Sequence, residues 1–392
     1  MLLVAEPTLG ADEKATLADV IDSGWITMGD RVRDFERAFA AAHKAGDAVA
    51  VNSCTAALHL AVEGLGIGPG DEVLVPALTF VATANSVLYA GAKPIFVDID
   101  SLDAPHISRQ GAAAKCTART KAVIVMHYGG YLADREAWRA FADARGLFLI
   151  EDCAHAPGAW RGSTIADAVA FSFYGNKNMT TAEGGMVLAR DSGVLDRIRQ
   201  ARSHGMTSGT LQRLSSGKSG YDVTMLGYNY RMDELRAAVG LVQIRHLESW
   251  NERRRVLTEA YRRRLAAQCP EISVPFSRPP RDSVYHILPV VLPEGTDREI
   301  VSEKLRAAGI QTTVHYPAVH QFSWYRMRFP SVRLPVTEEF ASRELTLPLH
   351  PRLDESDVEF VVHALSNALA SGSIHDKLDR SSAVAAASIR GP

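Results

Sequence analysis

The chain has 392 residues, more than one hydrophobic core usually organises, so two domains are expected. Hydrophobic residues make up 46% and charged residues 22%, which fits a globular protein and excludes disordered and fibrous classes. The net charge is −2 without a dense Lys/Arg run, so no nucleic-acid partner is expected. No apolar stretch approaches the roughly 18 residues of a membrane span, so no membrane partner is expected either.

The four cysteines, Cys54, Cys116, Cys153 and Cys269, show no CxxC spacing. This pattern predicts neither a metal site nor a disulfide framework. The N-terminus has no basic leader ahead of an apolar run. Together these features favour a reducing, cytoplasmic location.

The first part of the chain alternates helical and strand patterns. Helices are expected at 12–23, 31–45, 56–63, 82–90, near 107–115 and 132–145, and strands at 48–51, 72–76, 94–97, 122–126 and 147–150. The β-branched runs are too continuous to face water, so they predict a mostly parallel sheet covered by helices on both faces. Ligands of such sheets bind beyond the carboxyl ends of the strands.

Two short segments bear on phosphate binding. The glycine-rich run 64–70 follows a helix and precedes a strand, the reverse of a dinucleotide-binding motif, so it predicts a helix C-cap and turn. The polar turn 52–55 separates a strand from a helix, and this layout directs helix N-terminal amides toward an anion. Simple capping by Ser53 or Thr55 is equally consistent with the spacing.

The second part begins with a strand at 186–189, a helix at 191–201 and a long polar loop at 207–221, typical of a lid or subunit contact. A long exposed helix over 232–264 is expected to lead into a second domain, with Arg253–255 and Arg262–264 on its solvated face. Elements of an α+β domain follow: strands at 286–292 and 310–314 and helices at 297–308 and 355–370. We therefore predict a three-layer α/β/α large domain (1–250), a smaller α+β C-terminal domain (251–371) and a flexible tail (372–392).

Two residues indicate chemistry. Lys177 lies in a polar turn between two apolar runs, where burial would lower its pKa and leave a nucleophilic amine. An ordinary exposed lysine in a hairpin loop is the alternative. Asp152 ends a strand, where a carboxylate can hold a positively charged heterocyclic nitrogen, or simply cap a helix. A pyridoxal 5′-phosphate (PLP) enzyme needs both groups, an aromatic ring to stack on the cofactor, and donors for its phosphate.

The sequence resembles the DegT/DnrJ/EryC1/StrS sugar aminotransferases, a group within the aspartate-aminotransferase-like (fold type I) PLP enzymes. The resemblance extends over nearly the whole chain. It is carried by Gly24-Trp-Ile-Thr27, Asn52-Ser-Cys-Thr-Ala-Ala-Leu-His-Leu60, Gly68-Pro-Gly-Asp-Glu-Val73, Thr79-Phe-Val-Ala-Thr83, Glu151-Asp-Cys-Ala-His155, Phe171-Ser-Phe-Tyr-Gly-Asn-Lys177, Glu183-Gly-Gly185, Gly227-Tyr-Asn-Tyr-Arg231, Val314-His-Tyr-Pro317 and Leu345-Thr-Leu-Pro-Leu349.

The resemblance implies roles for the residues that contact the cofactor. Lys177 would form the Schiff base with PLP and later move a proton, and Asp152 would pair with the pyridinium nitrogen. Phe80 would stack on the ring. His155 would lie near the phenolic oxygen, with a buried capping histidine as the alternative.

It also implies how phosphate and substrate are held. Backbone amides of Thr55 and Ala56, the Ser172 hydroxyl and Asn229 of the partner subunit would bind the phosphate in a homodimer with shared active sites. Arg231 would contact a diphosphate across the interface or form a structural ion pair. Positions in the substrate pocket are implied for Trp25, Thr27, His315, Tyr316 and His320.

Two residues refine the expected function. Cys54 stands where the family commonly has glycine, which puts the φ angle of the phosphate turn in question. Lys177 argues for amino transfer, because the related dehydratases carry histidine there. The resemblance implies transfer from an amino acid, expected to be L-glutamate, to a nucleotide-linked keto sugar, expected to be a dTDP-4-keto-6-deoxyhexose. A C3-keto sugar, a cyclitol ketone, a PLP-dependent sugar dehydratase and a non-catalytic PLP-binding regulator remain the alternatives.

Overall fold

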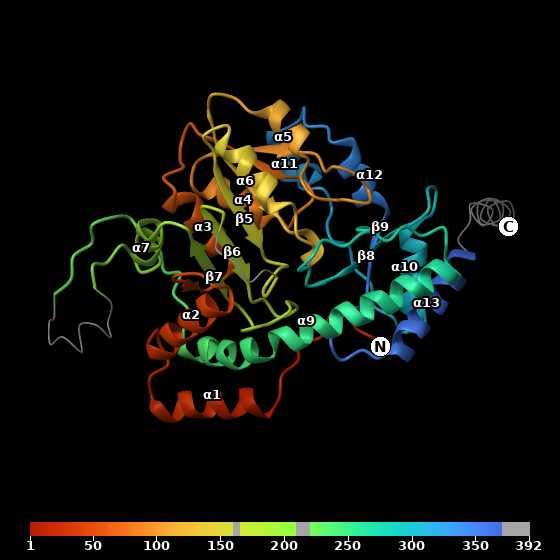
Figure 1. The fold of residues 1–392 in the computed structure, drawn as a ribbon, viewed down its shortest axis with the longest axis horizontal. Helices are drawn as coiled ribbons and strands as arrows, with labels where there is room; N and C mark the ends of the chain where they lie inside the picture. The colour runs from red at the N-terminus through yellow and green to blue at the C-terminus, as the bar shows by residue number, and fades with distance from the viewer. Residues whose placement is uncertain (160–164, 209–219, 371–392) are drawn as a thin grey trace, which may run out of the picture.

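The computed structural model of the protein describes residues 1–159, 165–208 and 220–370. A seven-stranded sheet in the order β1-β7-β6-β5-β4-β2-β3 forms its centre (Figure 1). The strands are β1 (Val49–Val51), β2 (Glu72–Pro76), β3 (Lys93–Val97), β4 (Thr120–Met126), β5 (Phe148–Cys153), β6 (Ala168–Ser172) and β7 (Gly185–Ala189). Only β7 runs antiparallel to its neighbours, so the prediction of a mostly parallel sheet is confirmed.

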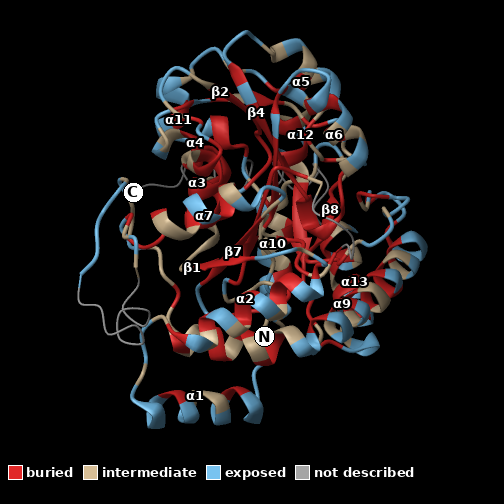
Figure 2. Ribbon diagram, turned by 60° about the vertical axis from the view of Figure 1, so that its left-hand side comes forward, coloured by how far each residue is buried: buried red, intermediate tan, exposed pale blue. Residues whose placement is uncertain are grey.

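Helices cover both faces of this sheet. They are α2 (Asp30–Ala42), α3 (Cys54–Gly64), α4 (Ala82–Tyr89), α5 (Arg109–Lys115), α6 (Arg135–Asp143) and α7 (Ser192–Ala201), whereas α1 (Ala11–Ser23) packs against the later helix α9 (Glu234–Gln268). Successive residues of β4 alternate between two cores: Val123 and Val125 pack with α2 and α6, whereas Ile124 packs with α3, α4 and α7. Figure 2 shows the central strands buried and the outer helix faces exposed. The three-layer α/β prediction is therefore confirmed.

The C-terminal elements surround a small antiparallel sheet. It consists of β8 (Leu288–Val291) and β9 (Glu344–Leu347), with helices α10 (Arg298–Ala307), α11 (Ser323–Arg328), α12 (Pro335–Arg343) and α13 (Glu355–Ala370) and the short 3₁₀ turn η2 (Val319–Gln321); another 3₁₀ turn, η1 (Tyr128–Gly130), follows β4. The expected strand at 310–314 is wrong. Ile310 and Thr313 form only isolated bridges, to Leu2 and Thr346, because the apolar pattern is too short to sustain a ladder there.

The long helix α9 (Glu234–Gln268) is less exposed than its sequence suggested. It begins at an N-cap formed by Asp233 and passes beneath α2 and beside α1 toward α13 (Figure 1). Arg255 lies on the solvated face with Glu252 and Glu259. Arg254 is instead 2% exposed and donates hydrogen bonds to the carbonyl oxygens of His286 and Leu349, so its expected place on the solvated face is wrong.

The domain boundary at 250 stays a prediction, because α9 continues through that position. The first residues pack with the C-terminal elements: Leu2 bonds to residues 309 and 311, and the Leu349 amide donates to the Val4 carbonyl. The proposed tail (372–392) and most of the expected loop at 207–221 lie outside the described residues. Among the described helices, none combines the length and apolarity needed to cross a membrane.

Candidate active site

Lys177 lies in the connection between β6 and β7. The two strands pair antiparallel, with Ser172 opposite Gly185, so residues 173–184 form a loop that is closed at its base. The Lys177 amide donates to the Tyr174 carbonyl over 3.0 Å, and the residue is partly buried rather than exposed. Burial lowers the pKa of Lys177 to about 8, against the opposing effects of Cys54 and Asp152. Its amine is therefore more readily available in the neutral form than that of an ordinary lysine.

Asp152 forms the buried floor of the site. It lies inside β5 and is 2% exposed, so it is part of a strand and caps no helix. The Thr83 hydroxyl donates to Asp152 Oδ2 over 2.7 Å, and the Ala154 amide donates to Oδ1 over 3.0 Å. Burial raises the pKa of Asp152, opposed by these two hydrogen bonds and by the charge of Lys177. A cationic ring nitrogen beside it would offset the cost of burying the carboxylate.

The N-terminus of α3 contains the expected phosphate turn. Ser53 is its N-cap, and its hydroxyl accepts a hydrogen bond from the Ala56 amide over 3.1 Å. The capping interpretation is thus correct, and the Ala56 amide is already bonded. The amides of Cys54 and Thr55 have no partner within the described parts of the chain, which leaves two donors for an anion. Cys54 is the first helical residue and has no positive φ, which resolves the question about the turn.

Ser172 ends β6 beside this turn. It is 5% exposed, and its hydroxyl oxygen accepts a hydrogen bond from the Tyr174 amide over 3.4 Å. The proton of the same hydroxyl therefore remains available to a ligand. The turn amides and the Ser172 hydroxyl together form a donor set suited to a phosphate group.

His155 has a defined tautomer. Its Nδ1 accepts from the Gly129 amide over 3.1 Å, so Nε2 carries the hydrogen and donates to the Tyr316 hydroxyl over 2.7 Å. Burial and the charge of Lys177 hold the pKa of His155 well below its usual value. The Tyr316 proton is consequently directed to another acceptor. The Phe80 ring lies 6.0 Å from that of Tyr316 and is 55% exposed, an open aromatic face above the site.

The remaining predicted substrate residues differ in their surroundings. His315 is buried near Lys177, whose charge contributes with burial to lowering the pKa of His315 to about 3. His320 instead bonds Glu338 Oε1 over 2.8 Å, and its ring lies beside Phe96. No hydrogen bond or ring contact brings His320 to Lys177 within the described residues.

Arg231 and Thr27 line a cavity of about 1030 Å³ between α2, α7 and the chain after α7. The other arginines of its wall form ion pairs: Arg33, Arg37, Arg199 and Arg202. Arg231 forms no ion pair with a described residue, and its Nη1 is buried without a hydrogen-bond partner there. Burial and the charge of Arg202 lower the pKa of Arg231. Of its two interpretations, the structural ion pair is therefore not observed.

Trp25 lies near this cavity, and Asn229 lies beside the phosphate turn. Trp25 packs its Nε1 close to Gly29, which lines the cavity, and this nitrogen is buried without a described partner. Asn229 has an exposed side chain, and its carbonyl accepts from Asn52 Nδ2 over 3.3 Å. Asn229 is therefore held beside the phosphate turn of its own chain through its backbone, with its side chain directed outward.

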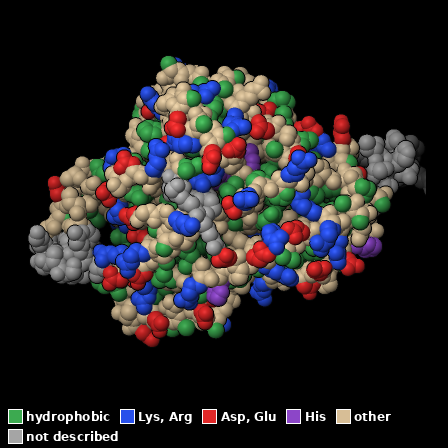
Figure 3. Space-filling view, viewed as in Figure 1, with side chains coloured by type: hydrophobic (Ala, Val, Ile, Leu, Met, Phe, Trp, Pro, Cys, Tyr) green, Lys and Arg blue, Asp and Glu red, His purple; other side chains and the backbone are tan. Residues whose placement is uncertain are grey.

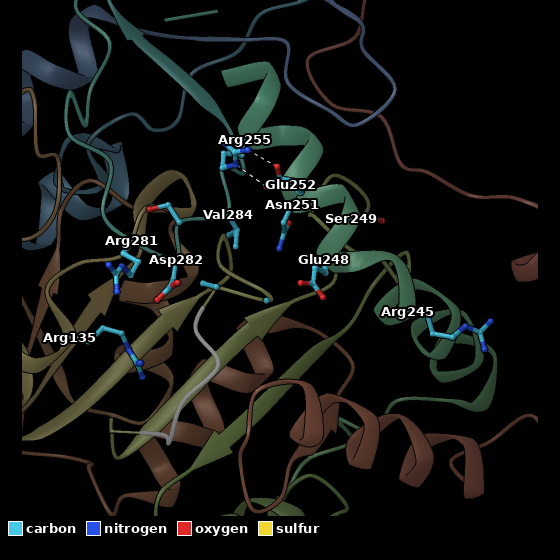
Figure 4. A pocket seen from close by; sticks show the side chains of 13 residues that line it. Arg135, Arg245, Glu248, Ser249, Asn251, Glu252, Arg255, Arg281, Asp282 and Val284 are labelled. Carbon is cyan, nitrogen blue, oxygen red and sulfur yellow. Dashed lines mark hydrogen bonds and ion pairs between the residues drawn. The ribbon is translucent and has the colours of Figure 1, made fainter. Parts of the chain in front are cut away.

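A second cavity, of about 1100 Å³, contains none of the predicted site residues. Figure 4 shows it between α9, Arg135 and residues 281–284, with Arg255 paired to Glu252 at its edge. Its wall combines arginines with Glu248, Glu252 and Asp282. Figure 3 likewise shows acidic and basic side chains interspersed on the visible face. This distribution lacks the one-sided field of a nucleic-acid interface.

Several residues of the site carried no sequence signal for their role. Thr83 was part of a recognised motif but had no predicted function, and Thr79 bonds its hydroxyl over 2.7 Å. Asn178, next to Lys177, holds the loop from below: its Nδ2 donates to Asn251 Oδ1 over 2.8 Å and to the Val284 carbonyl over 2.9 Å. The two bonds of Asn178 join residues far apart in sequence, so no local pattern could have indicated them.

Comparison with known proteins agrees with this geometry. The model of the DegT/DnrJ/EryC1/StrS aminotransferase family matches residues 7–366. The chain belongs to this family. It is 38% identical over 370 residues to the spore coat polysaccharide biosynthesis protein SpsC of Bacillus subtilis, covering 92% of this chain and 95% of SpsC.

Solved structures extend the comparison. The aminotransferase TlmJ of Streptoalloteichus hindustanus is 34% identical with a TM-score of 0.86, covering 95% of this chain and 99% of TlmJ. The PLP form of the putative sugar aminotransferase Spr1654 of Streptococcus pneumoniae is 28% identical with a TM-score of 0.84, covering 93% and 97%. This family member is therefore a PLP-dependent aminotransferase with the fold type I architecture.

The residues present fit the cofactor. A buried carboxylate suits the ring nitrogen, the Lys177 amine suits the aldehyde carbon, and the bare amides of Cys54 and Thr55 suit the phosphate. When bound, PLP supplies the electron sink that makes a donor's α-proton acidic. With PLP held in this way, Lys177 Nζ would be the base, Asp152 would be the negative charge beside the ring nitrogen, and Phe80 would cover the ring.

Proposed function

We propose that the enzyme transfers an amino group from L-glutamate to the keto group of a nucleotide-linked deoxysugar, with a dTDP-4-keto-6-deoxyhexose as acceptor. The observation that carries the nucleotide part of the proposal is Arg231. A partly buried guanidinium whose Nη1 is buried without a described partner favours an anionic ligand, and guanidinium groups bind phosphates through paired hydrogen bonds. The name of the relative SpsC, a polysaccharide biosynthesis protein, supports a sugar-linked reaction.

In this proposal the residues act in two groups. Lys177 anchors the cofactor and moves a proton at Nζ, and Asp152 keeps the cofactor's ring nitrogen positively charged. Phe80 covers the ring, His155 lies near the phenolic oxygen, and Ser172 binds the phosphate with the turn amides of Thr55 and its neighbour Cys54. The phosphate contact predicted for Ala56 is the weakest, since its amide already bonds Ser53.

The proposed substrate side is formed by other residues. Arg231 contacts the diphosphate, while Trp25, Thr27, His315 and Tyr316 surround the sugar, and His320 supports that wall through Glu338. The exposed side chain of Asn229 suits a homodimer in which Asn229 of the partner subunit completes each phosphate site. The absence of disulfides among four free cysteines, and the nucleotide-sugar acceptor, favour the cytoplasm.

The proposal is tested by incubating the PLP-loaded enzyme with ¹⁵N-labelled L-glutamate and a panel of C3- and C4-keto sugar nucleotides and cyclitol ketones. Mass spectrometry should detect a ¹⁵N-amino sugar nucleotide, with 2-oxoglutarate as coproduct. Loss of a hydroxyl without glutamate consumption would identify a dehydratase. Cofactor binding without any turnover would identify a regulator. Lys177→Ala, which lacks the amine, is the control that should form no product.

The role of Arg231 is tested separately. Arg231→Gln should raise KM for the sugar nucleotide by roughly 10- to 150-fold, the equivalent of about 1.5–3 kcal/mol for a charged hydrogen bond, and leave KM for glutamate much less affected. Arg33→Gln is the matched control, because Arg33 lines the same cavity but pairs with Asp30. Equal effects of the two variants would contradict a specific diphosphate contact.

A further inference from the structure

A second buried carboxyl is hydrogen-bonded to His315, one of the residues of the candidate site. Glu344, at the start of β9, is 0% exposed. Its Oε2 accepts from the His315 amide over 2.8 Å, and its Oε1 is bonded to the Thr346 hydroxyl over 2.5 Å. The Thr346 hydroxyl is in turn 2.9 Å from His315 Nδ1. These bonds form a continuous chain from a buried carboxyl to one edge of an imidazole ring.

The chain is held rigidly on both sides. The backbone groups of Thr346 and Thr313 exchange hydrogen bonds of 2.8 and 3.3 Å, which fixes the segment that ends at His315 against β9. The Tyr128 hydroxyl donates to the His315 carbonyl oxygen. His315 is therefore anchored at its amide, its carbonyl and Nδ1. Its other ring nitrogen, Nε2, bonds no residue in the described ranges, and the ring lies 6.1 Å from that of His155.

A single hydroxyl proton makes this chain directional. When Glu344 is ionised, Thr346 donates to the carboxylate and must accept from His315 Nδ1–H, so Nε2 presents a lone pair. When Glu344 is protonated, its carboxyl hydrogen donates a hydrogen bond to the Thr346 oxygen, and the Thr346 hydroxyl then donates to His315 Nδ1. Because Nδ1 is the acceptor in this state, the ring hydrogen lies on Nε2. The backbone bond from the His315 amide to Oε2 is the same in both states.

We propose that Glu344, Thr346 and His315 form a proton relay, in which the state of a buried carboxyl decides whether His315 Nε2 offers the bound sugar a hydrogen-bond donor or an acceptor. In one passage, the Glu344 proton moves to Thr346, the Thr346 proton moves to Nδ1, and the Nε2 proton leaves into the site. One proton is released and no other bond changes. Glu344 and Thr346 are positioning residues, since neither reaches the site itself.

The relay operates near neutral pH. Burial raises the pKa of Glu344 to about 8, opposed by its hydrogen bonds from Thr346 and His315 and by the charge of Arg298. The pKa of His315 is lowered to about 3, so the ring stays neutral and changes only its tautomer. Below about pH 8, Nε2 is the donor, and above it Nε2 is the acceptor. The titratable groups that act on these two residues from neighbouring elements are Arg298, Tyr128 and Tyr316 around Glu344 and Lys177, His155 and His286 around His315.

The relay can be observed without substrate, so the result does not depend on the proposed function. Only the identity of the bound ligand as a sugar rests on that function. Protein labelled with ¹⁵N-histidine is recorded by NMR between pH 6.5 and 9, and the His315 signals are assigned with His315→Gln. The expected result is a hydrogen on Nε2 at pH 6.5 that moves to Nδ1 at pH 9, with a midpoint near 8. A His315 ring that keeps one tautomer across this range would overturn the proposal.

Three variants test the connection. Glu344→Gln, whose amide donates to Thr346, should hold the hydrogen on Nε2 throughout the pH range. Thr346→Val should remove the pH response, and Thr346→Ser, which restores the hydroxyl, should restore it. A response that persists in Thr346→Val would contradict the relay, even if Glu344→Gln failed to fold.

Discussion

The end of β5 and the start of β9 each contain a carboxyl that is almost completely buried, and each is bonded by one threonine hydroxyl and one backbone amide. Asp152 is bonded by Thr83 and the Ala154 amide, and Glu344 is bonded by Thr346 and the His315 amide. Burial raises the pKa of both groups. The hydrogen-bond pattern is thus nearly the same around the two carboxyl groups.

The difference lies in the cation that each carboxyl faces. Asp152 interacts with Lys177 and, in the site proposed above, would also face a positively charged ring nitrogen, so binding of the cofactor would favour its ionised form. Glu344 has only the charge of Arg298, whose guanidinium bonds the Glu344 carbonyl and forms no ion pair with its carboxylate among the described contacts. Similar local bonding therefore supports a permanent charge in one place and an exchangeable proton in the other.

The largest expected effect is on the Asp152 side. Asp152→Asn keeps the shape but removes the charge, and should lower kcat/KM roughly 30- to 150-fold, or about 2–3 kcal/mol for a lost charged interaction. Steady-state kinetics with saturating PLP would measure it. The matched variant Glu344→Gln should lose distinctly less at pH 7, where Glu344 is protonated. Equal losses would remove the distinction between the two carboxyls.

A smaller effect is expected from the hydroxyl that bonds Asp152. Thr83→Val deletes one hydrogen bond to the carboxylate and should raise the pKa of Asp152 further, weakening PLP binding by roughly 3- to 10-fold for about 0.5–1.5 kcal/mol. Titration of the apo-protein with PLP, followed by absorbance, measures this. Thr83→Ser, which keeps the hydroxyl, is the control and should bind PLP close to wild-type affinity. Unchanged PLP binding in Thr83→Val would show that this bond does not tune Asp152.

The smallest effect concerns stability and pH on the Glu344 side. Between about pH 4.5 and 8 the folded protein retains a proton on Glu344 that the unfolded chain releases, so this group makes stability fall as pH rises through that window. Glu344→Gln should remove this dependence of stability on pH. The melting temperature of the variant, measured relative to that of the wild type, should therefore be higher at pH 8.5 than at pH 5. Glu303→Gln, an exposed exchange on α10, should show no such trend. A parallel shift at both pH values would contradict a buried, protonated Glu344.

The sequence predicted the surroundings of Asp152 and Lys177 much better than those of Glu344. Asp152 and Lys177 each follow or end a strong strand pattern, and the sheet register brings β5 and β6 together, so their neighbourhood could be inferred. Glu344 and Thr346 lie in the short strand β9, which was not expected. Their contact with His315 depends on an isolated bridge between Thr313 and Thr346, which leaves no periodic signal.

The same reasoning explains the other errors. The burial of Arg254 could not be inferred, because its two acceptors are carbonyl groups from separate segments, and helical spacing alone placed it with its charged neighbours. The fold class, by contrast, follows from many repeated local patterns, and one misjudged strand at 310–314 did not change it.

The most direct test of the central claim is to identify the lysine that carries the cofactor. Reduction of the PLP-loaded protein with sodium borohydride fixes the cofactor to its lysine, and peptide mass spectrometry then locates the adduct. We predict a phosphopyridoxyl group on the peptide that contains Lys177, and its absence in Lys177→Ala. An adduct on a different lysine, or none on the wild-type protein, would contradict this account of the site.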